Sequence, residues 1–391
     1  MTRTLIKGIT SLVTNDPRHD GTPFGVISGG ALIVDDEKIF WSGQESDAPK
    51  DQHENVVDLG GAAVIPGFVD SHTHLVFAGD RSHEFRARML GEKYTAGGIR
   101  TTVAATRNTS QAILLRKAEK LVREALLSGT TTIETKSGYG LTFEDEMRSL
   151  DIARQVADEV TFLGAHVFPQ EFENDHDGYV DLITKEMIPA IGNRADWIDV
   201  FCDRGAFDAE QTRRILKAGI AAGLKPRIHA NQLESGAGIK IGVELDCASV
   251  DHVSHTSDAE LELLAKSKTV ATLLPGAEFS TRSTYPDARR FIEAGVTVAL
   301  ASDCNPGSSY TTNMPLMIAL AVREMFMSPE QALWSATMGG AKALRRTDVG
   351  HLGAGATANF SILSSPDYIH LAYRPGVQLI KEVWRNGIAI S

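Results

Sequence analysis

Cysteine is scarce in this sequence, and long apolar runs are absent from it. The 391 residues include three cysteines, Cys202, Cys247 and Cys304. They are too few and too scattered for a disulfide framework or a thiolate metal cage. The sequence has no run of about 18 apolar residues, the length that a membrane span requires. Its first residues lack the apolar core of a signal peptide. We therefore expect a soluble, cytoplasmic protein.

Positive charge is also in short supply. The sequence has 39 Lys and Arg against 50 Asp and Glu, a net charge of −11, and no basic stretch stands out. Clusters of basic side chains bind nucleic acids and anionic membranes, so we expect neither as a partner. Hydrophobic residues make up 42% of the chain and charged residues 23%. These values are close to globular averages, which excludes a disordered or fibrous chain.

Both ends of the sequence have the texture of β-structure. From Leu5 to about Val64, short β-rich runs alternate with turn clusters, and the stretch GVQLIKEVW (376–384) alternates like a half-buried strand. We expect residues 1–64 and 352–391 to pack together as one small, discontinuous β-sandwich domain.

Between these ends, short apolar runs alternate with stretches of helical period. This alternation is typical of βα units. There are eight such runs, at residues 64–70, 130–136, 160–166, 197–203, 224–230, 247–253, 269–275 and 297–303. The pattern predicts an α/β fold in which residues 65–351 form a (β/α)8 barrel, with a doubly wound sheet as the structural alternative.

Histidines and an aspartate stand where several of these runs end, the place where barrel enzymes carry their reacting groups. They are His72, His74, His166, His229, His252 and Asp303. Residues two apart on a strand point to the same side, so His72 and His74 can bind one ion. With His229 and Asp303 added, three imidazoles and one carboxylate suit zinc or ferrous iron.

The sequence resembles the amidohydrolase superfamily over nearly its full length. The matching segments are PGFVDSHTHLVFAGDR, ETKSGYGL, FLGAHV, VDHV, LLPGAEF and SDCNPGSS. Within that superfamily it is most similar to members that hydrolyse 4-imidazolone-5-propanoate to N-formimidoyl-L-glutamate in histidine degradation. The run WIDVFCD (197–203) offers no lysine at its end, so the bridging carbamylated lysine of two-metal relatives is missing. The resemblance therefore implies one divalent ion per subunit, zinc or iron.

The resemblance also implies roles for individual residues. His72, His74, His229 and Asp303 would bind the ion, and a metal-bound hydroxide would attack the ring amide carbonyl. Asp303 would move the proton, assisted by His252, because Gln232 cannot carry one. The residues expected to contact the small-molecule substrate are Arg81, Tyr139, His166, Gln232, Asn305, Gly307 and Ser308. A homodimer is expected from the family.

Some of these positions also have local support. A guanidinium fork at Arg81 suits a propanoate carboxylate, and the turn around Tyr139 can project a phenol over a pocket. The connection that carries Arg81, at about 75–100, is compact and would shape that pocket.

Four other residues near the strand ends have plainer explanations. We expect Lys136 to pair with a carboxylate near the barrel rim and Cys304 to be a packed thiol. His255 lies three residues after His252 and would point elsewhere on a strand. We expect His83 to lie outside the pocket.

Two other functions remain open. Another cyclic amidase or a nucleobase deaminase of the same superfamily would share the ligand set, but a neutral base needs no clamp like Arg81. A non-catalytic barrel that acts as a scaffold is the alternative from another class, because fold does not fix function. The intact set of three histidines and one aspartate argues against the scaffold.

Overall fold

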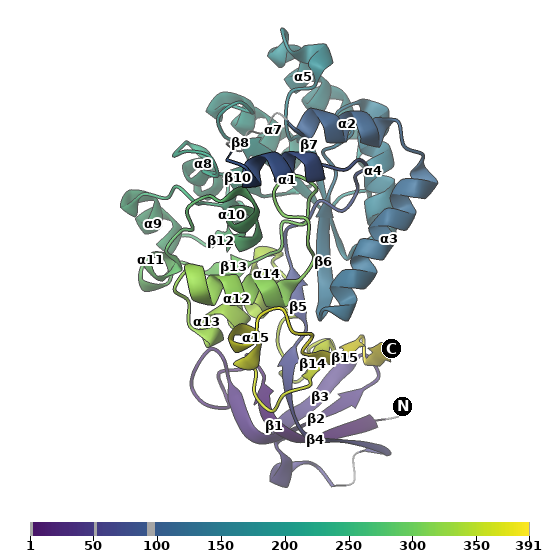
Figure 1. Ribbon diagram of the computed structural model, residues 1–391, viewed down its shortest axis with the longest axis vertical. Helices are drawn as coiled ribbons and strands as arrows, with labels where there is room; N and C mark the ends of the chain where they lie inside the picture. Colours follow the sequence, from purple (N-terminus) through teal and green to yellow (C-terminus); the bar gives the residue numbers. More distant parts are fainter. Residues whose placement is uncertain (1–2, 51–52, 92–97, 391) are drawn as a thin grey trace. The chain divides into compact units, whose positions relative to one another are not determined.

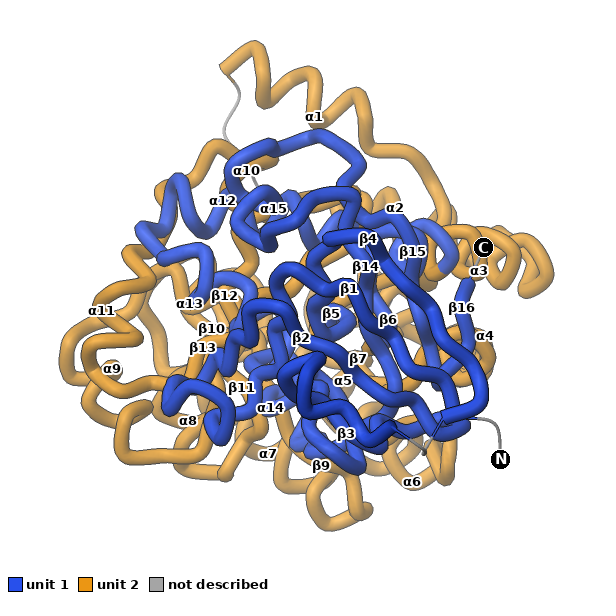
Figure 2. The backbone as a smooth tube through the Cα atoms, turned by 90° about the horizontal axis from the view of Figure 1, so that it is seen from below, with its two compact units in different colours: residues 1–70, 123–132, 313–391 blue, residues 71–122, 133–312 orange. Residues whose placement is uncertain are grey.

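The computed structural model describes residues 3–50, 53–91 and 98–390. It divides the chain into two compact units (Figure 2): unit 1 contains residues 1–70, 123–132 and 313–391, and unit 2 contains residues 71–122 and 133–312. Each unit is a group of residues that pack together, and its limits do not test the expected domains. The domain boundaries at 64/65 and 351/352 therefore stay a prediction. Among the described residues, no helix combines the length and the apolar character that a membrane span requires.

Unit 1 joins the two ends of the chain in one seven-stranded sheet. Its strand order is β16-β15-β14-β4-β1-β2-β3, and all neighbours are antiparallel except the parallel pair β1 and β4. The strands are β1 (Arg3–Val13), β2 (Val26–Asp35), β3 (Lys38–Gln44), β4 (Asn55–Pro66), β14 (Phe360–Leu363), β15 (Ile380–Arg385) and β16 (Ile388–Ile390). The prediction that the two ends form one β unit is confirmed.

The core of this sheet is apolar. Ile6 and Ile9 of β1 are both buried in it although they lie three residues apart, which strict strand alternation forbids. Gly8 between them has φ 69°, and the register of β1 against β2 shifts at this point. The bulge resets the alternation and lets both isoleucines face the core. The aromatic rings of Phe360 and Trp384 stack in the same core, with centroids 5.1 Å apart.

Parallel strands form the interior of unit 2, in the order β6-β7-β8-β10-β11-β12-β13. They are β6 (Thr130–Lys136), β7 (Glu159–Ala165), β8 (Trp197–Cys202), β10 (Ile228–Ala230), β11 (Ser249–His252), β12 (Val270–Leu273) and β13 (Val298–Leu300); the short β9 (Lys225–Pro226) pairs with β8. β6 begins within unit 1, where β5 (Phe68–Asp70) lies beside its start through the bond from the Phe68 N–H to the Gly129 carbonyl (2.9 Å).

The segment 71–74 closes the barrel at the carboxyl ends of the strands. On one side, the backbone N–H of Lys136 donates to the Thr73 carbonyl (3.0 Å). On the other side, the N–H of Asp303 donates to the His72 carbonyl (3.0 Å) and the N–H of His74 to the Cys304 carbonyl (2.9 Å). These bonds nearly close a ring of eight parallel strands, so the predicted (β/α)8 barrel is confirmed and the doubly wound alternative is wrong.

Three of the helices begin at a capping residue. Asp208 caps α7 (Ala209–Ala221), Ser257 caps α9 (Asp258–Ala265) and Ser328 caps α13 (Pro329–Trp334), each in a full capping box. α7 packs on β8, and α8 (Gly238–Glu244) packs on β10 and β11. Figure 1 shows α7 beside β8 and α8 beside β10.

The remaining helices used below are α1 (Ser82–Met89), α4 (Phe143–Val156) and α10 (Pro275–Thr281). Residues 92–97 of the connection expected to be compact lie outside the described residues.

Candidate active site

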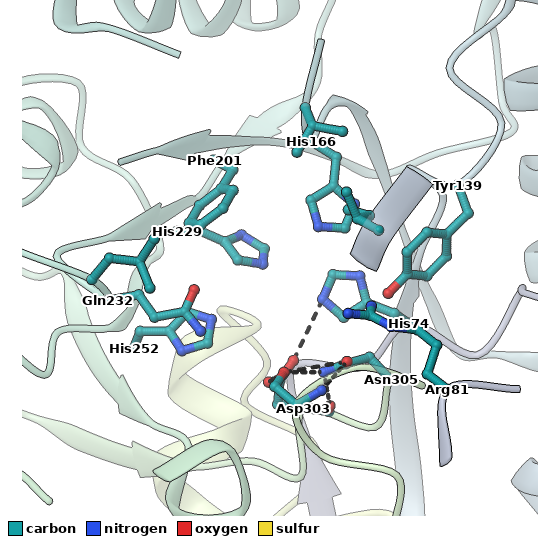
Figure 3. A pocket seen from close by; sticks show the side chains of 14 residues that line it. His74, Arg81, Tyr139, His166, Phe201, His229, Gln232, His252, Asp303 and Asn305 are labelled. Carbon is teal, nitrogen blue, oxygen red and sulfur yellow. Dashed lines mark hydrogen bonds and ion pairs between the residues drawn. The ribbon is translucent and has the colours of Figure 1, made fainter. Parts of the chain in front are cut away.

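The two histidines that follow β5 point at the same place in unit 2. Nε2 of His72 lies 3.2 Å from Nε2 of His74, and each of these nitrogens lies 3.6 Å from Oδ1 of Asp303. Figure 3 shows His74 and Asp303 facing each other. Two imidazole nitrogens and a carboxylate oxygen therefore converge from two neighbouring strand ends, as the HxH spacing predicts.

Two further histidines approach His72 from β10 and β11. The ligand atoms of His72, His229 and His252 all lie within 4.8 Å of one another, as do those of His72, His74 and Asp303. The ring centroids of His72 and His229 are 4.5 Å apart. The structure thus gathers the other three predicted ligand residues around His72, with His252 beside them.

The chemistry of this donor set fits zinc or ferrous iron. Nδ1 of His72 lies 2.8 Å from Oδ2 of Asp251, and Nδ1 of His229 lies 3.0 Å from Oδ2 of Asp199. Because a carboxylate accepts, each Nδ1 carries the proton and each Nε2 keeps its lone pair for an ion. Burial lowers the pKa of His72 well below its ordinary value, so this ring is neutral near pH 7. Neutral imidazoles with a carboxylate are ligands that both metals accept.

Asp303 is held in an uncommon backbone conformation. Its φ is 50°, and that of His252 is 77°; non-glycine residues in this region are infrequent and cluster at functional sites. Ser308 Oγ donates to Oδ2 of Asp303 (3.2 Å), and Asn305 Nδ2 donates to its backbone carbonyl (2.7 Å). Burial raises the pKa of Asp303 well above its ordinary value. This carboxylate therefore takes up a proton more readily than an exposed aspartate.

The turn that follows Asp303 bonds mainly to itself. Oδ1 of Asn305 accepts from the backbone N–H groups of Gly307 and Ser308, both at 2.8 Å, and Asn305 Nδ2 donates to Ser308 Oγ (2.8 Å). The turn therefore orients Asp303. The expected contacts of Asn305, Gly307 and Ser308 with substrate stay a prediction.

These groups face one pocket, which has about 520 Å³ of space, part of it open to solvent. All the predicted site residues line it except His72, which is buried behind it, and Gly307. Figure 3 shows His229, Gln232 and His252 on one side of the pocket and Tyr139 and Arg81 on the other.

His166 enters the pocket against the ring of His74. The two rings stack with centroids 5.3 Å apart and planes 22° apart. Nδ1 of His166 lies 3.0 Å from the Gly138 carbonyl, which can only accept, so Nδ1 is the donor and Nε2 is an acceptor. Burial lowers the pKa of His166 to about 3. At neutral pH this residue is an uncharged acceptor toward the pocket.

Tyr139 stands on a turn that a buried glutamate fixes. The Glu146 carboxylate accepts from the backbone N–H groups of Gly138, Gly140 and Leu141 at distances of 2.8 to 3.2 Å. Sequence reasoning missed Glu146. Its signal is an acidic side chain on the buried face of α4.

Arg81 is buried and ion-paired. It is 5% exposed, its Nη2 donates to Oε2 of Glu84 (2.7 Å), and its Nε donates to Oε1 (3.1 Å). A Cβ added at Gly307 would lie 2.3 Å from Nη1 of Arg81, so glycine leaves room for the guanidinium there. Arg88, two helical turns further along α1, donates to the Gly307 carbonyl (2.8 Å). Sequence reasoning missed Arg88. Its spacing of seven residues from Arg81 is the signal that could have found it.

Two other carboxylates near the pocket also escaped sequence reasoning. Asp203 accepts from the backbone N–H groups of Gln232 (2.8 Å) and Leu233 (2.9 Å), and so fixes the loop that carries the Gln232 amide. Glu278 in α10 is 3% exposed, and its Oε1 accepts from Ser254 Oγ (2.7 Å). Burial raises the pKa of Glu278 to about 7.

The residues with plainer explanations behave as expected. Lys136 is fully buried and pairs with Glu134 (2.9 Å) and Asp199 (3.1 Å). Cys304 is buried. His255 and His83 are exposed, and neither lines the pocket.

Comparisons with known proteins find relatives over nearly the full length of the chain. The amidohydrolase family pattern matches residues 63–388. An imidazolonepropionase from Mycolicibacterium smegmatis is 60% identical over 99% of this chain and 97% of its own length. One from Streptomyces griseus is 58% identical over 99% of both chains.

Solved structures share the fold at low identity. A guanine deaminase from C. acetobutylicum, solved with guanine in its active site, matches with a TM-score of 0.73 and 15% identity over 100% of both chains. An adenosine deaminase from Xanthomonas campestris with bound zinc matches with a TM-score of 0.72 and 17% identity, over 99% of this chain and 92% of that one.

Proposed function

The chain belongs to the amidohydrolase family and, within it, to the imidazolonepropionases, and from this membership we propose how its own residues carry out the reaction. The activity is hydrolysis of 4-imidazolone-5-propanoate to N-formimidoyl-L-glutamate, a step of histidine degradation. The observation that carries it is 60% identity to an imidazolonepropionase over nearly the whole of both chains.

We propose that His72, His74, His229 and Asp303 hold one divalent ion, zinc or iron. The convergence of their ligand atoms on His72 supports this set, and zinc in the adenosine deaminase of the same fold supports a divalent metal. When bound, such an ion polarises a carbonyl and lowers the pKa of water to about 7.

Asp303 is the proton carrier in this proposal. It accepts a proton from the attacking water as the water oxygen bonds to the ring carbonyl carbon. It returns that proton to the ring nitrogen as the C–N bond breaks. His252 lines the same pocket and holds the attacked carbonyl or the incoming water in place. Gln232 contributes hydrogen bonds but no proton.

The substrate contacts follow from the two sides of the pocket. Arg81 binds the propanoate carboxylate, with Glu84 setting the orientation of the guanidinium. Tyr139, His166 and Gln232 hold the ring. Asn305, Gly307 and Ser308 form the turn beside Arg81, near the part of the ring that becomes the glutamate product.

The test is a spectrophotometric assay with freshly made imidazolone propanoate, with ammonia release followed in parallel. We expect loss of the imidazolone absorbance without ammonia. Ammonia release from a nucleobase, with no turnover of the imidazolone by fully metallated protein, would indicate a deaminase instead.

Three further proposals concern the protein as a whole. We propose a homodimer, to be checked by sedimentation. We propose a cytoplasmic location, which the three buried cysteine thiols support. We also propose that residues 65–351 are the catalytic barrel domain and that residues 1–64 and 352–391 form the small β domain.

A further inference from the structure

A continuous chain of buried charged groups links two of the histidines proposed as ligands. Every member lies in unit 2 and is at most 3% exposed. In order of contact the members are His72, Asp251, Arg227, Glu134, Lys136, Asp199 and His229. We call this set the buried ion-pair chain.

One arm of the chain leads from His72 to Glu134. Nδ1 of His72 meets Oδ2 of Asp251 at 2.8 Å, and Nη2 of Arg227 donates to the same oxygen at 2.9 Å. Nη2 of Arg227 also donates to the Ser71 carbonyl (2.7 Å), directly before His72 in sequence. Nη1 of Arg227 lies 3.7 Å from Oε1 of Glu134. This arm therefore fixes the ring of His72 and the backbone before it.

The other arm leads from His229 to the same glutamate. Oδ2 of Asp199 lies 3.0 Å from Nδ1 of His229, and Oδ1 of Asp199 accepts from the backbone N–H of His229 (3.1 Å). Nζ of Lys136 lies 3.1 Å from Oδ2 of Asp199 and 2.9 Å from Oε1 of Glu134. This arm fixes both the ring and the backbone of His229.

Glu134 is where the two arms meet. Both buried cations, Lys136 and Arg227, face its Oε1, which also accepts from Thr161 Oγ1. Its Oε2 accepts from the backbone N–H of Thr73 (3.1 Å), and Thr73 Oγ1 donates to the Glu134 carbonyl (2.6 Å). Thr73 stands between His72 and His74. One carboxylate is thus connected to all three histidines proposed as ligands, although it touches none of them.

The charge arrangement explains why the central group is a carboxylate. Asp199 and Asp251 can orient their histidines only while they are ionised, and each needs a cation in this dry interior. Lys136 and Arg227 supply those cations. The negative charge of Glu134 between them offsets their mutual repulsion. An amide at this position has one acceptor and one donor group, so it would turn a donor toward Lys136 or toward the Thr73 N–H.

We propose that Glu134 is a positioning residue that holds the His72 and His229 arms, and the Thr73 backbone, in the geometry that retains the ion. The inference rests on the proposed ligand set. Partners behind metal-bound histidines typically contribute about 10- to 100-fold to metal affinity or activity.

The test compares Glu134→Gln with Glu159→Gln, using zinc-loaded full-length protein. Glu159 is the matched control because its backbone pairs with that of Glu134 in the barrel sheet, while its side chain accepts from the indole of Trp197 (2.9 Å) at the amino end of β7. The rate of zinc transfer to a coloured chelator is measured without substrate. We expect about 10-fold or faster loss of zinc from Glu134→Gln and wild-type loss from Glu159→Gln.

A second variant covers the case in which Glu134→Gln does not fold. Glu134→Asp keeps the negative charge, so we expect it to fold. Its shorter side chain withdraws the carboxylate from its partners, so it should lose zinc faster than wild type and give an altered cobalt absorption spectrum. Zinc loss and a cobalt spectrum like those of wild type would overturn the positioning role, even if the melting temperature falls. A wild-type protein that binds neither zinc nor iron would instead overturn the proposed ligand set.

Discussion

The sheet of unit 1 and the barrel interior of unit 2 bury different kinds of side chain. The sheet packs Ile6, Ile9 and Phe360 into an apolar core. The barrel, near the carboxyl ends of its strands, buries Lys136 and Arg227 completely. Buried charge is a poor source of stability, because desolvation offsets the attraction between partners. The first region is therefore built for stability, whereas the second serves the site.

The largest effect on activity is expected at a proposed metal ligand of unit 2. His229→Ala removes one of four protein ligands, so the protein should lose affinity for its ion, and kcat should fall by orders of magnitude. Excess zinc should restore part of the activity. Metal content and kcat are measured beside the exposed His255→Ala, which should behave like wild type. Undiminished metal content in His229→Ala would remove His229 from the ligand set.

A smaller but still large effect is expected at the propanoate clamp. Losing a charge-assisted fork is worth about 2 to 4 kcal/mol, so Arg81→Gln should raise KM about 30- to 1000-fold with a smaller loss in kcat. Arg86→Gln, an exposed arginine on the same helix, serves as the control. Wild type should use a substrate lacking the propanoate poorly. Arg81→Gln should use that substrate about as well as wild type does. A native KM in Arg81→Gln would favour a neutral cyclic amide as substrate.

In unit 1 the expected effect is on stability alone. Ile6→Ala leaves a cavity in the sheet core and should cost about 2 to 5 kcal/mol of unfolding free energy, while the exposed Val56→Ala should change it little. Denaturant unfolding measures the loss, and kcat of the folded enzyme should stay at the wild-type value. A large fall in kcat at a temperature where Ile6→Ala is folded would show that this core also serves the active site.

The smallest effect concerns a buried carboxyl of unit 2. Burial raises the pKa of Glu278 from an ordinary 4.5 to about 7. The folded state therefore keeps this proton to higher pH than the unfolded chain, so the destabilisation grows from about pH 4.5 and is complete above pH 7. Glu278→Gln, studied without metal, should exceed wild type in stability by up to about 3 kcal/mol at pH 8, and the gain should vanish toward pH 4.5. A gain that does not vary with pH would refute the titration, and Glu262→Gln on the surface is the control.

The sequence predicts the apolar sheet core of unit 1 better than the charged barrel interior of unit 2. The two β-rich ends, the eight runs and the strand-end residues His72, His74 and Asp303 are predictable because alternation and strand ends leave a local pattern. Glu134 and Asp199 were missed because strand interiors are expected to be apolar. Apart from Lys136, the other residues of their strands, TTTIETK and WIDVFC, are apolar or β-branched. The charged residues that interrupt these strands are a signal that could have found them.

The pairing partners could not have been predicted in the same way. The contacts of Asp251 with His72 and of Arg227 with Glu134 join strands far apart in sequence. They depend on the order and register in which the barrel closes, which single-strand patterns do not contain.

The most direct test of the central claim is a titration of metal into chelated protein, with ring opening of imidazolone propanoate followed at each step. We expect no activity without metal and a rise with zinc or iron that levels off at one ion per chain. Full activity in the metal-free protein, or a rise that levels off only at two ions per chain, would contradict it.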